Sequence, residues 1–135
     1  MASTALVDSH CHLHMLAGGA ADPAPYLEEA RNRGIGHFLT VSVDLDSAPD
    51  LLALAEAHPE ISTSVGVHPC GRELREVAPA ELARQADHPQ VLAIGETGLD
   101  AHCADADDRE WQIQRFRDQV RAARIARKPV IIHSR

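Results

Sequence analysis

The sequence is poor in aromatic residues and contains no long apolar run. Tryptophan, tyrosine and phenylalanine make up 3% of its 135 residues, so a buried core must be built mainly from aliphatic side chains. No stretch approaches the roughly 18 consecutive apolar residues typical of a membrane helix, so no membrane span is predicted. The first residues form neither a basic segment nor an apolar one. No secretory signal is therefore predicted, and the expected location is the cytoplasm.

An excess of basic residues is also missing, and cysteines are few. The formal net charge of −7 argues against sequence-independent wrapping of nucleic acid by a basic face. A phosphodiester substrate remains compatible with this charge, because bound cations supply positive charge locally. Cys11, Cys70 and Cys103 are widely spaced and include no C-x-x-C pair. This spacing predicts three free thiols rather than a disulfide framework or a zinc finger.

What the sequence does contain is a regular alternation of apolar runs and helical stretches. The runs typical of strands occupy residues 5–8, 37–43, 61–67, 91–95 and 129–132. Helical stretches follow the capping sequences at residues 22–23 and 47–50, and occupy residues 79–86 and 105–127. Strand–helix alternation predicts an α/β fold with a parallel sheet, here about four strand–helix units and a fifth strand in a single domain, residues 1–135.

The longest helical stretch carries an apolar stripe at three- and four-residue steps. The stripe starts at Trp111 or Ile113 and continues through Phe116, Val120 and Ala123. This periodicity is typical of an amphipathic helix and predicts that the stripe faces the core.

Metal-capable side chains fall where the predicted strands end. His10 and His12 follow the first strand, His68 the third, Glu96 the fourth and His133 the fifth. In a parallel α/β sheet the carboxyl ends of all strands lie on one edge, which is where active sites form in such folds. Four separate strands thus direct histidine or glutamate toward one rim, which predicts a metal site.

The residue types and their spacing fit this interpretation. His10 and His12 are two residues apart, so in an extended segment both imidazoles point to the same face. Imidazole favours zinc or manganese, whereas phosphoryl chemistry favours magnesium. Glu96 emerges from a buried run, and its two oxygens suit the bridging of two cations. The glycines on either side of it, Gly95 and Gly98, are expected to let the backbone turn tightly near a ligand.

Other polar residues leave more than one interpretation open. H-x-H alone also fits a polar loop, and a single histidine such as His68 also fits a hydrogen-bonded rim position. Arg135 is a candidate for pairing with a phosphate, but it is equally compatible with exposure to solvent. The strand is expected to turn before His14, which therefore receives no role. The remaining histidines fall at strand starts, helix ends or loops and also receive none: His37, His58, His88 and His102.

Taken together, these residues resemble the TatD family of metal-dependent hydrolases, within the amidohydrolase-like superfamily. The matching segments occur in the family's order and at about its spacing, and are residues 6–13, 66–69, 94–100 and 128–135. The resemblance implies a (β/α)₈ TIM-type barrel, of which this chain supplies the N-terminal half. It also implies divalent-metal hydrolysis of phosphodiesters, typically by a deoxyribonuclease that acts from DNA ends.

The resemblance assigns roles to individual residues. It implies that His10 and His12 bind a first metal, that Glu96 bridges two metals and that His133 binds the second. The two divalent ions are expected to be magnesium, manganese or zinc. His68 is expected near the substrate, and the implied mechanism is attack of a metal-activated water on phosphorus. The family's general-base aspartate lies at a later strand end, so no catalytic base is expected in this chain.

Two features depart from the family pattern. Ala101 and His102 follow the Gly-Leu-Asp segment where an aromatic residue is usual, so the substrate-side loop is expected to differ. A closed barrel needs about 250 residues, so the chain is expected to be truncated. It would then be a fragment of a longer enzyme, a half completed by a second chain or by a copy of itself, or a remnant. On its own, the chain is expected to have weak or no activity.

Two rival functions remain open. One is an amidohydrolase-type enzyme that cleaves C–N or ester bonds in small molecules, since H-x-H at the first strand is shared with such enzymes. The Gly-Glu-Thr-Gly-Leu-Asp segment favours phosphodiesters instead, because those enzymes more often place a modified lysine on the fourth strand. The other rival is a catalytically inactive remnant that binds metal. Hydrolysis assays distinguish the first rival from a phosphodiesterase. Metal stoichiometry distinguishes the inactive remnant from a working two-metal site.

Overall fold

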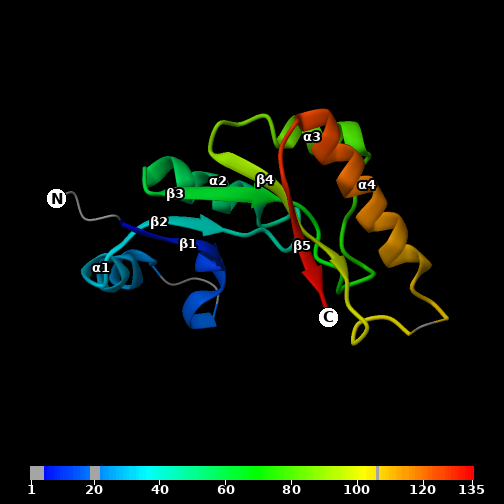
Figure 1. Cartoon of the computed structure of the whole chain (residues 1–135), viewed down its shortest axis with the longest axis horizontal. Coiled ribbons are helices and arrows are strands. Elements are labelled where there is room, and N and C mark those ends of the chain that lie inside the picture. The colour runs from blue at the N-terminus through cyan, green and yellow to red at the C-terminus, as the bar shows by residue number, and fades with distance from the viewer. Residues whose placement is uncertain (1–4, 19–21, 106) are drawn as a thin grey trace.

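The computed structural model describes residues 5–18, 22–105 and 107–135. Along them, strands and helices alternate, and the strands form one parallel sheet in sequence order (Figure 1). The strands are β1 (Leu6–Cys11), β2 (Ile35–Thr40), β3 (Ile61–Val65), β4 (Val91–Leu99) and β5 (Val130–Ser134). The helices are the 3₁₀ helix η1 (Leu13–Gly18), α1 (Ala24–Asn32), α2 (Ala48–Ala57), α3 (Pro79–Gln85) and α4 (Glu110–Ala126). The predicted α/β fold with parallel strands is confirmed.

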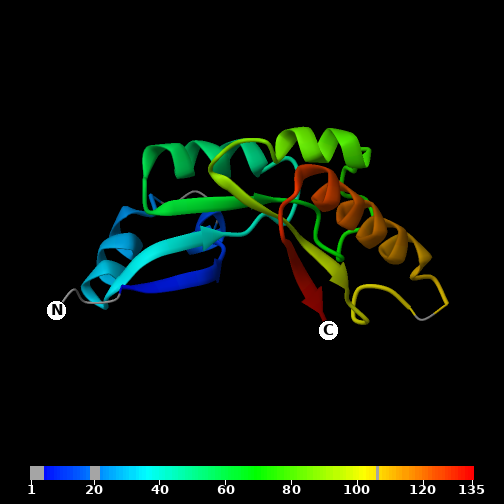
Figure 2. The same ribbon diagram turned by 45° about the horizontal axis from the view of Figure 1, so that its top comes forward.

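The sheet is curved, and the α-helices lie on its outer side. Figure 2 shows the strands as an arch, with α2 and α3 above it and α1 and α4 toward its two ends. Parallel strands that are neighbours in sequence order are what the first half of a (β/α)₈ barrel requires. The carboxyl ends of the strands consequently meet along one rim.

Strand boundaries differ from the sequence-based expectation most clearly at β4. This strand continues to Leu99 instead of ending at Gly95, so the expected tight turn around Glu96 is wrong. Gly95 has φ +135°, and a Cβ atom there would lie 2.6 Å from the carbonyl oxygen of Ile131. The glycines therefore permit close approach of β5 rather than a turn.

Helix starts differ as well. The last helix begins at Glu110, not at residue 105, and Ala106 lies outside the described residues. The side chain of Ser47 does not cap α2. The backbone N–H of Ser47 instead donates to Asp44 Oδ1 at 2.7 Å. α1 begins one residue later than expected, with Pro23 rather than Asp22 at the N-cap, and the N–H of Ala24 donates to Asp22 Oδ1 at 3.0 Å.

Two apolar clusters hold the helices against the sheet. The larger joins β3 and β4 to α3 and α4, and comprises Leu45, Val65, Val67, Leu82, Ala86, Val91, Ile94, Ala122 and Ala123. The smaller joins η1, α1 and α2 to β2 and β3, and comprises Leu13, Leu27, Phe38, Ala55 and Ile61. Every residue of β3 is buried, as expected for the central strand of the sheet.

The face of α4 that packs inward is largely polar, so the predicted apolar stripe is confirmed only at its end, where Ala123 is 3% exposed and belongs to the larger cluster. Gln112, Arg115 and Gln119 are each at most 4% exposed, whereas Trp111 and Phe116 are only half-buried. The physical reason is that this face covers loop backbone rather than side chains alone. Loop carbonyl and N–H groups that are buried need hydrogen-bond partners, and apolar side chains provide none.

The prediction of three free thiols is wrong for two of the cysteines. Cys70 and Cys103 form a disulfide, with their Cα atoms 5.2 Å apart, and Cys11 is free. The two cysteines are 33 residues apart in sequence. They meet because one follows β3 and the other follows β4, and these strands are neighbours. Cysteine spacing alone does not reveal such a pairing.

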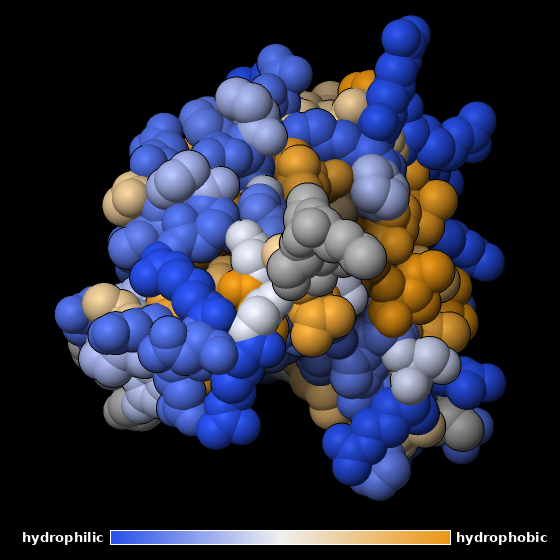
Figure 3. Space-filling model, turned by 60° about the vertical axis from the view of Figure 1, so that its left-hand side comes forward, coloured by the Kyte–Doolittle hydropathy of each residue, from blue (hydrophilic) through white to orange (hydrophobic). Residues whose placement is uncertain are grey.

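Both edge strands leave apolar side chains exposed. Leu6 and Val7 of β1 are 64% and 61% exposed, and Ile132 of β5 is 62% exposed. Figure 3, seen from the end of the molecule that carries α1 and β1, shows apolar side chains gathered between hydrophilic surfaces. Within the described ranges, no helix combines the length and apolar character needed to cross a membrane.

Candidate metal centre

Five of the residues selected from the sequence meet at the rim of the sheet. Glu96 of β4 lies at the centre and is 6% exposed. Its Oε2 lies 3.3 Å from His10 Nε2 and 3.7 Å from His12 Nε2. Its Oε1 lies 2.8 Å from His133 Nδ1 and 4.0 Å from His68 Nε2. The two carboxylate oxygens thus face two different pairs of imidazoles.

The backbone fixes Glu96 in this position. Its N–H donates to the carbonyl of Ser42, beyond β2, at 2.8 Å. Burial acts to raise the pKa of the Glu96 carboxyl, but the bond from His133 and the nearby His10 and His68 outweigh it and lower that pKa. The side chain is therefore an anion at neutral pH, as a cation ligand must be.

His12 is oriented with a lone pair toward Glu96. Its Nδ1 lies 2.9 Å from the carbonyl oxygen of Val41. Because a carbonyl only accepts hydrogen bonds, Nδ1 carries a proton, and in the neutral ring Nε2 then carries the lone pair. A histidine that donates its other ring N–H to a backbone carbonyl is the usual arrangement of a metal ligand.

His68 has the opposite tautomer. The N–H of Cys70 donates to His68 Nδ1 at 3.0 Å, so the neutral ring carries its proton on Nε2. Burial lowers the pKa of His68 more than the neighbouring carboxylates raise it, which favours the neutral ring. Its Nε2 therefore points a hydrogen-bond donor, not a lone pair, into the centre.

Asp100 is a site residue that sequence reasoning missed. It is 2% exposed, and its Oδ2 lies 2.8 Å from His133 Nε2. Although burial acts to raise it, the pKa of Asp100 is lowered, because the N–H of His102 and the ring of His133 donate to the carboxylate. The available signal was the spacing of Glu96 and Asp100, since residues four apart along a strand share a face.

Both ring nitrogens of His133 contact carboxylates. Burial lowers the pKa of His133, but its hydrogen bonds to Glu96 and Asp100 outweigh this and raise that pKa, so the metal-free ring favours the imidazolium. Loss of the Nδ1 proton would leave Nε2–H bonded to Asp100 and a lone pair beside Glu96. This is the carboxylate–histidine arrangement found around metals.

Arg135, a selected residue, and His14, which was given no role, both stand apart from the centre. Arg135 is exposed, and its backbone pairs with Leu99 and Ala101. Within the described ranges, its guanidinium makes no hydrogen bond or ion pair with the site residues. His14 lies in η1, as expected from the end of the strand, and its ring centroid is 6.0 Å from that of His12. Burial lowers the pKa of His14.

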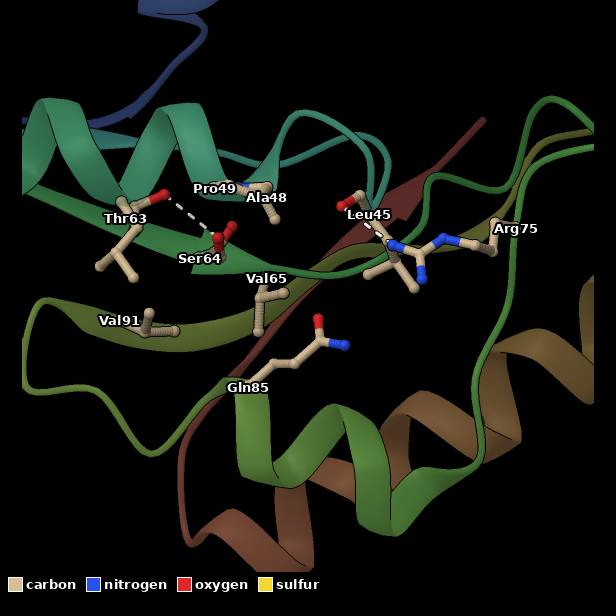
Figure 4. Close-up of a pocket in the computed structure, with 10 residues that line it drawn as sticks. Leu45, Ala48, Pro49, Thr63, Ser64, Val65, Arg75, Gln85 and Val91 are labelled. Carbon is tan, nitrogen blue, oxygen red and sulfur yellow. Dashed lines mark hydrogen bonds between the residues drawn. The ribbon is translucent and has the colours of Figure 1, made fainter.

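A groove opens beside the centre. It has a volume of about 460 Å³ and is lined by His12, Met15, Val43, Asp44, His68, Cys70, Gly71, Leu74 and Glu96. A second pocket, of about 290 Å³, lies between α2, β3, β4 and α3 (Figure 4). Its walls are mainly apolar, and Arg75 is its charged lining residue, bonded to the carbonyl of Leu45 at 3.4 Å. Of the two, only the groove at the rim is lined by residues of the candidate centre, namely His12, His68 and Glu96.

The donor set fits divalent cations. His10, His12 and Glu96 place one ligand atom each within 4.8 Å of one another, and so do His68, Glu96 and His133. Imidazole and carboxylate donors suit zinc or manganese. In the second group, however, the tautomer of His68 leaves His133 and Glu96 as the better donors.

Comparison with known proteins places this arrangement in context. Residues 7–135 match the family model described as TatD related DNase. An uncharacterized metal-dependent hydrolase TatD of Mycobacterium tuberculosis is 35% identical over 136 residues, which cover 96% of this chain and 52% of that protein. A 3'-5' ssDNA/RNA exonuclease TatD of Erwinia tasmaniensis is 34% identical over 118 residues, covering 86% of this chain and 45% of that protein.

Solved structures agree in fold. The TatD homologue YJJV of Escherichia coli superposes with a TM-score of 0.81 at 27% identity, over 96% of this chain and 50% of that one. A TatD family hydrolase of Entamoeba histolytica gives a TM-score of 0.77 at 22% identity, which supports the fold alone. The chain spans about half the length of the relatives it matches.

Proposed function

The chain belongs to the TatD related DNase family of metal-dependent hydrolases, and on that basis we propose that it supplies ligands to both cations of a two-metal centre that hydrolyses phosphodiester bonds. The observation that carries the proposal is the placement of Glu96. Its carboxylate is buried, and one oxygen faces His10 and His12 while the other faces His133. A bridging carboxylate between two imidazole groups is suited to holding two cations side by side.

Each side chain has a distinct role in this proposal. His10 and His12 would hold one cation, His133 would hold the second, and Glu96 would be a ligand of both. When bound, such cations would supply water activation and stabilisation of the charge that develops on the phosphoryl group. His68 donates a hydrogen bond from Nε2 to a phosphate oxygen in the adjoining groove. Arg135, if drawn toward the rim by substrate, adds a guanidinium to the same anion.

Nucleic acid is the substrate class that the comparisons favour. The relative from Erwinia tasmaniensis is named as an exonuclease of single-stranded DNA and RNA. The net charge of −7 argues against binding of a polyanion through a broad basic face, and bound cations would supply positive charge locally. Full activity would also need the strands that complete the barrel, supplied by a longer chain, by a second chain or by a copy of this one.

Metal binding is the first test. Calorimetric titration of the purified chain with Mn²⁺ or Zn²⁺ is expected to give two ions per chain. Glu96→Gln should weaken binding at both positions by at least about tenfold, whereas Glu28→Gln, on the exposed surface of α1, should leave it unchanged. A single weak ion that is indifferent to Glu96→Gln would instead support the inactive remnant.

Hydrolysis assays test the substrate class. A phosphodiester reporter and a cyclic amide are compared at equal metal concentration, with His10→Ala as the site variant. Weak or no phosphodiester hydrolysis is expected from this chain alone, and a metal-dependent rate is expected once the barrel is completed. Cleavage of the cyclic amide in preference to the phosphodiester would support the C–N hydrolase alternative.

A further inference from the structure

The disulfide between Cys70 and Cys103 lies beside the metal centre but has no part in the proposed hydrolysis. Cys70 follows β3, two residues after His68, and Cys103 follows β4, three residues after Asp100. Cys70 is half-buried and Cys103 is exposed, so the bond is accessible from solvent. Two sulfur atoms thus stand at the rim where the imidazoles and carboxylates gather.

A buried carboxylate is directed at this disulfide. Asp100 Oδ2 lies 3.5 Å from Cys70 Sγ, and Asp100 is 2% exposed. A disulfide sulfur has no proton to donate, so this contact is not a hydrogen bond while the disulfide is intact. One ligand atom from each of Cys70, Asp100 and Cys103 lies within 4.8 Å of the others, the same closeness as in the two imidazole groups.

We propose that reduction of this disulfide creates a third cation site, in which Cys70, Cys103 and Asp100 bind a thiophilic divalent ion such as zinc. Thiolate sulfur and carboxylate oxygen are both zinc ligands, and three protein ligands leave a fourth position open. Reformation of the disulfide abolishes the site, because its sulfurs can no longer ionise to thiolates. The rim therefore binds one more cation when this disulfide is reduced than when it is intact.

The chemical step is a thiol–disulfide exchange. A dithiol reductant supplies two electrons and two protons, the bond between Cys70 and Cys103 breaks, two thiols form, and the reductant leaves as its own disulfide. Binding of the cation then releases the two thiol protons, since the thiolate is the ligand form.

Asp100 links this third site to the centre described above. The oxygen that approaches Cys70 is the same Oδ2 that lies 2.8 Å from His133 Nε2. A cation held by the thiolates competes with His133 for this oxygen. Reduction followed by cation binding therefore weakens the contact between Asp100 and His133. The third cation site itself does not depend on the proposed hydrolysis.

The test compares cobalt binding by the oxidised and reduced chain. The protein is reduced with a phosphine, which does not supply thiols of its own, and is then titrated with Co²⁺ without oxygen. The reduced form is expected to bind one more ion than the oxidised form and to show sulfur-to-cobalt charge-transfer absorption. Imidazole and carboxylate ligands do not produce that absorption, so it reports cobalt bound to sulfur.

Variants assign the signal to these sulfurs. The double variant Cys70→Ser/Cys103→Ser should bind cobalt as the oxidised wild type does, whereas Cys11→Ser should retain the extra ion and the absorption. Equal uptake by both redox forms, unfolding on reduction seen by circular dichroism, or absorption that persists in the double variant would overturn the proposal. If the oxidised chain binds no cobalt but the reduced chain binds one, the proposed function fails and the third site stands.

Discussion

The side-chain amide of Gln112 makes two hydrogen bonds to the backbone of Asp100. Its Nε2 donates to the Asp100 carbonyl at 3.0 Å, and its Oε1 accepts from the Asp100 N–H at 3.1 Å. The same Nε2 donates to the carbonyl of Pro69 at 2.9 Å. One glutamine of α4 therefore joins the loop after β3 to the loop after β4, and these loops carry His68 and Asp100.

Removal of this amide should destabilise the fold. Gln112→Leu leaves buried N–H and carbonyl groups of two loops without partners, at about 1–3 kcal/mol for each unsatisfied group, so we expect a total loss of about 3 kcal/mol. Chemical denaturation measures it. Gln114→Leu, on the exposed face of the same helix, is the control and should change stability by less than about 0.5 kcal/mol. Equal effects of the two substitutions would contradict this role of Gln112.

Asp100 should tune the metal affinity of His133. Asp100→Asn keeps the shape but removes the negative charge that orients the ring and raises its basicity. Loss of such a partner typically weakens metal binding by about 10–100-fold, and we expect a decrease in that range for one of the two ions. Competition with a chromophoric chelator measures this affinity for zinc. Asp87→Asn, at an exposed position, is the control, and an unchanged affinity in Asp100→Asn would remove Asp100 from the centre.

The tautomer of His68 predicts that it is not a metal ligand. Its Nδ1 accepts from Cys70, so the nitrogen that faces Glu96 carries a proton. His68→Gln should therefore leave the number of bound ions unchanged, as should the control His58→Gln. Nitrogen-15 NMR of the metal-free protein should show His68 in the Nε2–H form. Loss of one ion in His68→Gln would instead assign this residue to the second metal.

Cys11 should react slowly with alkylating reagents. Burial and, to a smaller extent, the charge of Asp8 raise the pKa of its thiol to about 12, and Sγ donates to the carbonyl of Leu39 at 3.4 Å. A raised pKa disfavours the thiolate, so at pH 8 only about one molecule in 10⁴ carries it. Alkylation, followed by mass spectrometry, should accelerate about tenfold per pH unit. In the reduced protein, alkylation of the exposed Cys103 at pH 8 should be much faster.

The sequence was sufficient for the strand order and for most of the centre. Parallel strands end on one edge, so His10, His12, Glu96 and His133 had to converge there once the strands were assigned. The inward face of α4 was not predictable in the same way. Periodicity finds apolar stripes, but Gln112 is buried because the backbone of neighbouring loops needs donors and acceptors, which no local pattern reports.

The disulfide and the length of β4 could not be predicted from the sequence, for related reasons. The pairing of Cys70 with Cys103 depends on which strands are neighbours, and this is a property of the sheet. The sequence predicts a turn at the glycines of β4, because glycine permits turns as readily as close backbone approach. Only the position of β5 distinguishes the two, since it fills the space where a side chain at Gly95 would stand.

Gly98 should be the least replaceable glycine of the sheet. It pairs with His133, and a Cβ atom at Gly98 would overlap the His133 carbonyl. Gly98→Ala must therefore push β5 away, so we expect a stability loss of more than about 2 kcal/mol and weaker metal binding. Gly34→Ala is the matched control, because Gly34 has φ +89° but nothing within 4 Å of the added carbon.

The comparison separates backbone strain from collision. Gly34→Ala carries only the cost of a left-handed conformation, about 1 kcal/mol, and should leave metal affinity intact. Both losses are measured by denaturation, and both affinities by zinc competition. One outcome is that Gly98→Ala destabilises the fold no more than Gly34→Ala does and leaves zinc affinity unchanged. In that case β5 tolerates displacement, and the position of His133 does not depend on the close contact between β4 and β5. If Gly98→Ala loses both stability and zinc, the approach of β5 at Gly98 is what brings His133 to Glu96.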